Sequence, residues 1–148
     1  MDAFFLYAET EEAPMSVGAT LIFEGRLPYA KFKEHIASRL HLVPRYRQRV
    51  IPAPLNISNP TWEDDPDFDI DNHIFRVKLD KPGTEKELQQ LKGQLFTGML
   101  DRNKPLWEMY VVEGLSNQRS SVILKVHHAM VDGVAGISLA YLLSLIHI

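Results

Sequence analysis

Two apolar runs joined by a polar stretch constrain the fold of this chain most strongly. Residues 107–112 (Trp-Glu-Met-Tyr-Val-Val) and 120–127 (Ser-Ser-Val-Ile-Leu-Lys-Val-His) have the length and the β-branched and aromatic content of strands. The residues between them, 113–119, include Gly, Ser and Asn and predict a hairpin-like loop. We therefore expect at least one antiparallel strand pair.

The remaining segments alternate between strand-like and helix-like patterns. Strands are predicted over 16–24 and 70–79, a helix from Pro28 to about Leu40, an extended segment with one basic face over 44–54, and a loop over 56–69. Thr84 and Glu87 form a capping box, and apolar residues then repeat at helical spacing as far as Leu100. This order predicts an α/β (α+β) fold with a mixed sheet and helices on one face.

The composition excludes several function classes. The 148 residues are 45% hydrophobic and carry a formal net charge of -3, which argues against a nucleic-acid-binding protein. There are no cysteines, so disulfides, thiolate metal sites and cysteine nucleophiles are excluded. The N-terminus lacks the basic start of a signal peptide, and the longest apolar stretch, 137–146, is about half of the ~20 residues that span a bilayer.

One compact motif carries the chemistry. His127-His128-Ala129-Met130-Val131-Asp132-Gly133 stands where the second hairpin strand gives way to a helix-like run. An imidazole titrates near neutral pH and can take a proton from a hydroxyl or a thiol, so this position suits general base catalysis. In a strand the two histidines would point to opposite faces, so that one could enter a reaction channel while the other packs behind it. A hydrogen-bonded structural pair is the alternative.

The neighbours of the two histidines have more than one interpretation. No Glu or Cys completes a zinc-site spacing with them, so we predict no metal site. Asp132 either caps the following helix, which we favour, or orients the base. Gly133 and Gly136 either let a ligand approach the helix N-terminus closely or serve helix packing.

Other charged and titratable groups are less specific. Arg45, Arg47 and Arg49 could meet phosphates of a ligand, but a solvated basic face is the simpler interpretation. The acidic residues between 63 and 69 do not match an EF-hand and indicate a solvated loop. The remaining histidines that we considered are expected to be surface or capping residues: His35, His41 and His73.

The motif resembles the HHxxxDG signature of the CoA-dependent acyltransferase superfamily, which includes chloramphenicol acetyltransferase, carnitine acyltransferases and condensation domains of nonribosomal peptide synthetases. Further short sequence motifs, spread over residues 2–142, resemble those of the bacterial wax ester synthase/diacylglycerol acyltransferase family. They are residues 2–9 (Asp-Ala-Phe-Phe-Leu-Tyr-Ala-Glu), 14–18, 44–47, Trp62, 67–73, 100–102 (Leu-Asp-Arg) and 105–108 (Pro-Leu-Trp-Glu). The resemblance implies the N-terminal half of a chloramphenicol acetyltransferase-like fold.

The resemblance also implies residue roles. His128 would be the general base, His127 would support it, and Asp132 would hold the shape of the motif. Pro105, Leu106 and Trp107, like Gly133 and Gly136, would line the substrate site, although Trp107 fits a plain core residue equally well. Ser16 departs from the family, which often has a histidine there.

The implied activity is transfer of a fatty acyl group from acyl-CoA to diacylglycerol or to a long-chain alcohol. Acyl-CoA is a substrate, and no cofactor is implied. The enzyme would be cytoplasmic and peripheral to a membrane or to lipid inclusions. Two alternatives remain open: another HHxxxDG enzyme, such as a condensation-type amide former, or a non-catalytic module that binds lipid or acyl-CoA.

The resemblance implies a second domain of similar fold that supplies the opposite wall of the channel, so the present chain is expected to be inactive alone. The chain stops at residues 143–148 (Leu-Ser-Leu-Ile-His-Ile) in the middle of an apolar helical pattern, without a cap or a polar tail. These residues match the translation of a transposon end used in sequencing libraries. We therefore expect an incomplete N-terminal domain over 1–142 followed by a non-native tail. A coincidental apolar helix end is the alternative.

Overall fold

A computed structural model describes residues 3–56 and 60–130 of the chain. Its helices are α1 (Ala3–Ala8), α2 (Tyr29–Arg39) and α3 (Glu85–Leu95). Its strands are β1 (Ser16–Glu24), β2 (Gln48–Ile51), β3 (Thr61–Asp64), β4 (Ile74–Lys78), β5 (Trp107–Leu115) and β6 (Arg119–His127). Within these ranges no helix is long and apolar enough to cross a membrane.

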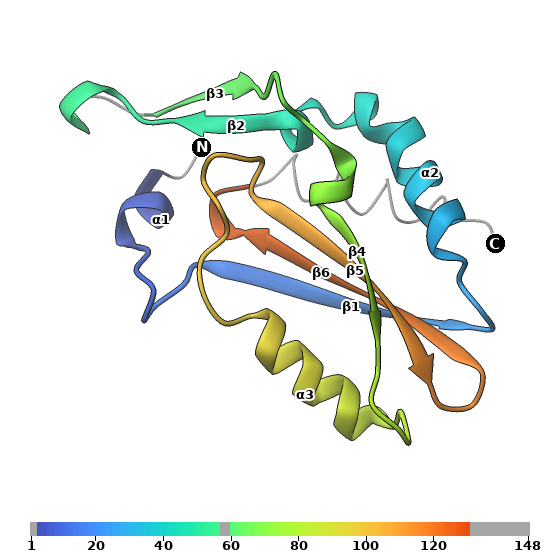
Figure 1. Cartoon of the computed structure of the whole chain (residues 1–148). Helices are drawn as coiled ribbons and strands as arrows, with labels where there is room; N and C mark the ends of the chain where they lie inside the picture. The colour runs from blue at the N-terminus through green and yellow to red at the C-terminus, as the bar shows by residue number, and fades with distance from the viewer. Residues whose placement is uncertain (1–2, 57–59, 131–148) are drawn as a thin grey trace.

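The main sheet has four strands in the order β1-β6-β5-β4 (Figure 1). The β5–β6 hairpin is antiparallel, as predicted, and β1 pairs antiparallel with the other side of β6. β4 runs parallel to β5, which makes the sheet mixed. The predicted mixed sheet is therefore confirmed, and β6 is an interior strand that is hydrogen-bonded on both sides.

The helices do not lie on one face of this sheet. Alternate residues of β5 point to opposite faces, so Val111 belongs to a core cluster with Phe32 and Ile36 of α2, whereas Val112 belongs to a cluster with Leu88 of α3. In Figure 1, α2 and α3 accordingly lie on either side of the sheet. The expectation of helices on a single face was wrong because β6 is buried on both faces, a pattern that requires a cover on each side.

The segment between α2 and β4 differs most from the sequence expectation. Of the extended segment predicted over 44–54, Gln48–Ile51 is a strand, but Pro44–Arg47 form a 3-10 turn. Arg45 and Arg47 therefore lie in the turn and Arg49 in the strand, so the predicted period-two basic face is not formed. Arg45 lies over the ring of Trp62 and Arg47 over that of Phe68, at 4.6 and 5.4 Å from the ring centroids. The predicted loop over 56–69 contains β3, which pairs antiparallel with β2.

The boundaries of two predicted elements also shift. The strand expected from Ile70 begins at Ile74, because Ile70–Asn72 form a 3-10 turn capped by Asp69. Thr84 is the N-cap of α3, but its hydroxyl donates to the Glu87 carboxylate at 2.6 Å and does not cap a backbone N–H. The helix ends at Leu95, and Gly98 follows with a positive φ of 79°, so Leu100 lies outside it.

Candidate functional site

The two histidines of the motif lie at the end of the interior strand. β6 ends at His127, and His128 begins a 3-10 turn that runs to Met130. The backbone N–H of His127 donates to the Leu106 carbonyl at 3.0 Å, and the N–H of His128 donates to the Met15 carbonyl at 2.7 Å. Because the residues that directly precede β5 and β1 hold both backbone amides, the pair has a fixed position at the edge of the sheet.

The strand alternation predicted for both histidines stops at His127, because His128 belongs to the turn. His128 is half-buried. Ser16, where the family often has a histidine, lies directly opposite His127 in the β1–β6 register. Asp132, Gly133 and Gly136 lie outside the described residues.

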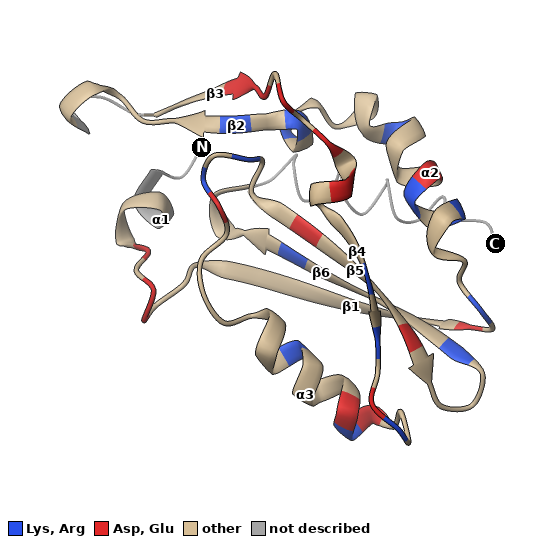
Figure 2. Cartoon of the chain, in the orientation of Figure 1, with Lys and Arg blue, Asp and Glu red and all other residues tan. Residues whose placement is uncertain are grey.

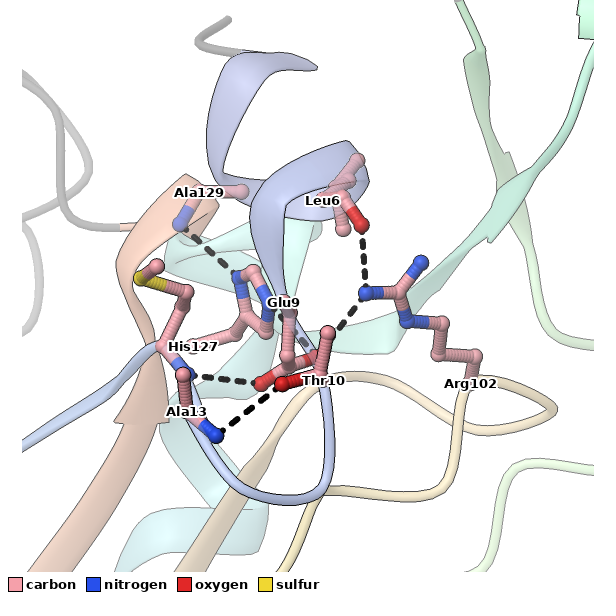
Figure 3. A network of polar contacts seen from close by, with 8 residues as sticks. Leu6, Glu9, Thr10, Ala13, Arg102, His127 and Ala129 are labelled. Carbon is pink, nitrogen blue, oxygen red and sulfur yellow. Dashed lines mark hydrogen bonds and ion pairs between the residues drawn. The ribbon is translucent and has the colours of Figure 1, made fainter.

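The side chain of His127 is fully buried, and both ring nitrogens are hydrogen-bonded. Its Nδ1 accepts the backbone N–H of Ala129 at 3.0 Å. Nδ1 therefore carries no proton, and the ring proton of the neutral imidazole resides on Nε2. Nε2 lies 3.1 Å from Oε1 of Glu9, to which it donates (Figure 3). This arrangement leaves His127 without a lone pair for a substrate proton.

Glu9 is the centre of a buried polar network in Figure 3. Its Oε1 also accepts from Nη2 of Arg102 at 2.8 Å, and its Oε2 accepts the backbone N–H of Met15 at 2.9 Å. The same Nη2 of Arg102 donates to the Leu6 carbonyl at 2.6 Å, which ties α1 to the loop before β5. A buried carboxylate is tolerated when it is paired and fully hydrogen-bonded, and this one is.

The network shifts the pKa values of its members in directions that fit their environments. Burial lowers the pKa of His127, although the nearby Glu9 carboxylate opposes this effect. Burial alone would raise the pKa of Glu9, but the hydrogen bonds from Arg102 and Met15, together with the His127 ring, bring it below its ordinary value. The network is therefore a neutral imidazole, a carboxylate and a guanidinium.

The Pro105-Leu106-Trp107 segment lies in the core of the described domain. Leu106 and Trp107 have no exposed surface, and Pro105 is also buried. The Trp107 indole N–H donates to the Tyr46 carbonyl at 2.7 Å, and its ring stacks on His73 with centroids 4.6 Å apart. These contacts favour the core interpretation of Trp107. The backbone of Leu106 nevertheless contacts His127 directly through the hydrogen bond given above.

His73 was expected to be a surface or capping residue. It is the C-cap of the Ile70–Asn72 turn, where its backbone N–H donates to the Ile70 carbonyl, but a position at the surface was wrong. It is 1% exposed, its Nδ1 donates to the Trp107 carbonyl at 2.7 Å, and its ring lies between those of Trp107 and Phe68. Burial lowers the pKa of His73. An isolated histidine in a polar loop gave no sequence signal for this stacking.

Sequence reasoning missed the parts played by Glu9 and Arg102. Both lie in short motifs that resemble the family, but no spacing rule links positions 9, 102 and 127.

Within residues 3–56 and 60–130, no group of three or more His, Asp or Glu side chains could hold a metal ion.

The two buried histidines predict a loss of stability on acidification. Each has a lowered pKa in the folded protein, so below about pH 6.5 the unfolded chain binds more protons than the folded one. The stability that the two neutral histidines contribute should be fully present above this pH. The free energy of unfolding should fall as the pH drops toward the folded pKa values, by up to about 1.4 kcal/mol per pH unit for each histidine. Urea unfolding between pH 7.5 and 5.5 measures this slope.

His73→Asn is the matched control for that measurement, because an asparagine amide can still donate to the Trp107 carbonyl but does not titrate. We expect it to remove about half of the slope that the two histidines produce. An identical slope in wild type and His73→Asn would contradict the contribution of His73.

The model of the wax ester synthase/diacylglycerol acyltransferase catalytic domain matches residues 1–144. The chain belongs to this family. A probable diacylglycerol O-acyltransferase of Mycobacterium tuberculosis, tgs1, is 40% identical over 138 residues, which are 91% of this chain and 30% of that protein. The chain thus spans about a third of the length of this curated relative.

Solved structures agree with the family. The wax ester synthase/diacylglycerol acyltransferase from Marinobacter aquaeolei VT8 superposes with a TM-score of 0.78 at 28% identity, over 94% of this chain and 36% of that one. The starter condensation domain of rhizomide synthetase superposes with a TM-score of 0.68 at 14% identity, over 94% of this chain and 33% of that one, and shows a shared fold. The expected chloramphenicol acetyltransferase-like fold class is thereby confirmed.

Proposed function

We propose that the full-length protein containing this chain transfers a fatty acyl group from acyl-CoA to the hydroxyl of a diacylglycerol or a long-chain alcohol. The observation that carries this proposal is the family match over residues 1–144, which includes both histidines of the motif. The name of the mycobacterial relative supports diacylglycerol as one acceptor. The name of the Marinobacter protein supports a wax-forming alcohol as the other.

His128 is the general base in this proposal. Both nitrogens of His127 are committed to Ala129 and Glu9, so His127 does not take the substrate proton, and the resemblance of the motif to the family assigns the base to His128. His128 takes the proton of the acceptor hydroxyl as its oxygen attacks the thioester carbonyl. The new C–O bond forms, the C–S bond breaks, and the proton passes from His128 to the departing CoA sulfur.

The thioester already supplies an activated acyl group, so the reaction as proposed needs no metal or prosthetic group, and acyl-CoA is a substrate. In this proposal Asp132 keeps the motif in shape, and Gly133 and Gly136 allow close approach of the substrate. A second domain forms the opposite wall of the channel. In this proposal the enzyme works in the cytoplasm, at the surface of a membrane or lipid inclusion that holds its lipid substrates.

Sequencing the source DNA beyond the codon for Leu142 tests the domain proposal first. A frame that continues into a second domain of similar size would support it and would supply the protein for assays. A stop codon directly after Ile148 would contradict it, and a binding role would then replace the enzymatic one.

The activity test offers palmitoyl-CoA to the full-length protein with three acceptors in turn: a diacylglycerol, hexadecanol and hexadecylamine. We expect triacylglycerol or wax ester, detected by mass spectrometry, together with one CoA released per ester formed. Amide formation without ester would instead favour a condensation-type enzyme. Lipid binding without any product would favour a non-catalytic module.

A further inference from the structure

The carboxylate of Glu9 joins three parts of the chain that are far apart in sequence. Its side chain has no exposed surface, and it contacts Arg102 from the loop before β5 and His127 from the end of β6 (Figure 3). In Figure 2 the other acidic residues are spread over loops, strands and helices. Removing a carboxylate from water is costly, so a fully buried one requires several donors in place.

The donors around Glu9 specify a carboxylate and not merely a polar side chain of that size. Oε1 accepts from His127 and Arg102, and Oε2 accepts from Met15, so three donors converge on two oxygens. A glutamine has one acceptor oxygen, and its amide N–H groups would face a donor on the other side. The site therefore selects for a group that only accepts hydrogen bonds.

Glu9 reaches His128 by two separate routes. The first runs through the side chain of His127, whose backbone immediately precedes His128. The second runs through Met15, whose N–H donates to Glu9 and whose carbonyl accepts the N–H of His128 at 2.7 Å. Both routes are short, and both end on the backbone that carries the proposed base.

We propose that Glu9, held by Arg102, is a positioning residue of the acyl-transfer reaction, which fixes the strand end and the turn that present His128 to the substrate. The inference rests on the proposed function. It assigns no contact with substrate to Glu9. A small displacement of a catalytic group can lower a rate by about 10²-fold, so loss of this support should act on kcat.

Three variants of the full-length enzyme test the proposal: Glu9→Ala, Glu9→Gln and Glu9→Asp. We expect Glu9→Ala to lower kcat by about 10²-fold and to change KM for palmitoyl-CoA by less than about twofold, because the binding surface is kept and the orientation is lost. Glu9→Gln should lose nearly as much. Glu9→Asp should retain more activity than Glu9→Gln, because it keeps the acceptor-only carboxylate at the cost of one methylene.

Ser120→Ala is the matched control. Ser120 is buried at the opposite end of the same strand, where its hydroxyl accepts the Leu27 N–H at 2.9 Å and donates to the Gly25 carbonyl at 2.8 Å. It therefore also loses buried hydrogen bonds of β6, but far from His128. We expect its melting temperature to fall, as for the Glu9 variants, while its kcat stays within about twofold of wild type.

Three outcomes would overturn the inference. One is a kcat loss in Glu9→Ala and Glu9→Gln no larger than in Ser120→Ala. Another is a loss confined to KM. The third is a higher kcat in Glu9→Gln than in Glu9→Asp, which would indicate that the size of the side chain matters and its acceptor chemistry does not. If Glu9→Ala does not accumulate folded, the Gln and Asp variants decide. A wild-type enzyme that transfers no acyl group would overturn the proposed function and this inference together, whereas the other outcomes affect this inference alone.

Discussion

Replacing His128 with alanine is expected to lower kcat for ester formation by about 10²–10⁴-fold, the range that a positioned general base contributes. The change removes the imidazole that would take the acceptor proton, while the hydrogen bond from the residue 128 N–H to Met15 remains available to any side chain. KM for acyl-CoA should change little. Initial rates with palmitoyl-CoA and a saturating acceptor measure the effect in the full-length enzyme.

Two further histidine variants are compared with His128→Ala, and the first of them is the control. His41→Ala removes an exposed imidazole from the turn after α2 and should leave the rate unchanged. His127→Ala should lower both activity and the free energy of unfolding, because it removes one of the three donors to the buried Glu9 carboxylate and leaves the Ala129 N–H without its acceptor. A His128→Ala enzyme with a near-normal rate would contradict the assignment of the base.

The sequence predicted the main sheet well because its strands carry strong local signals. β1 was predicted over the same residues, 16–24, and the β5–β6 pair follows from two apolar runs with a polar turn between them. β3 was missed because Thr-Trp-Glu-Asp contains three polar residues of four and owes its strand conformation to pairing with β2. A short strand on a small two-stranded sheet has little local pattern to find.

In the candidate site, too, local pattern could predict one part and not the other. The motif placed the two histidines at a strand end, which local pattern can indicate. The partners of His127 come from positions 9 and 129, and Arg102 comes from a third segment, so the network depends on tertiary contacts across 93 and 118 residues of chain. Similarly, the burial of His73 depends on Trp107, which lies 34 residues away. Periodicity along a sequence carries no information about such contacts.

Replacing Trp107 with alanine is expected to lower the free energy of unfolding by about 3–5 kcal/mol, the usual cost of emptying a fully buried aromatic site. Trp107 has no exposed surface, stacks on His73 and meets the Tyr46 ring edge-on with centroids 5.7 Å apart. Its removal would also leave the Tyr46 carbonyl without the indole donor. Urea unfolding followed by circular dichroism measures the loss without relying on tryptophan fluorescence.

Trp107→Phe separates packing from hydrogen bonding and, in the same experiment, core from channel wall. Phenylalanine keeps most of the aromatic contact with His73 but cannot donate to the Tyr46 carbonyl, so we expect a smaller loss of about 1–3 kcal/mol. If Trp107 is a core residue, kcat of the folded Trp107→Phe enzyme should stay near wild type. A variant of undiminished stability whose activity collapses would contradict the core interpretation and favour a place for Trp107 at the substrate channel.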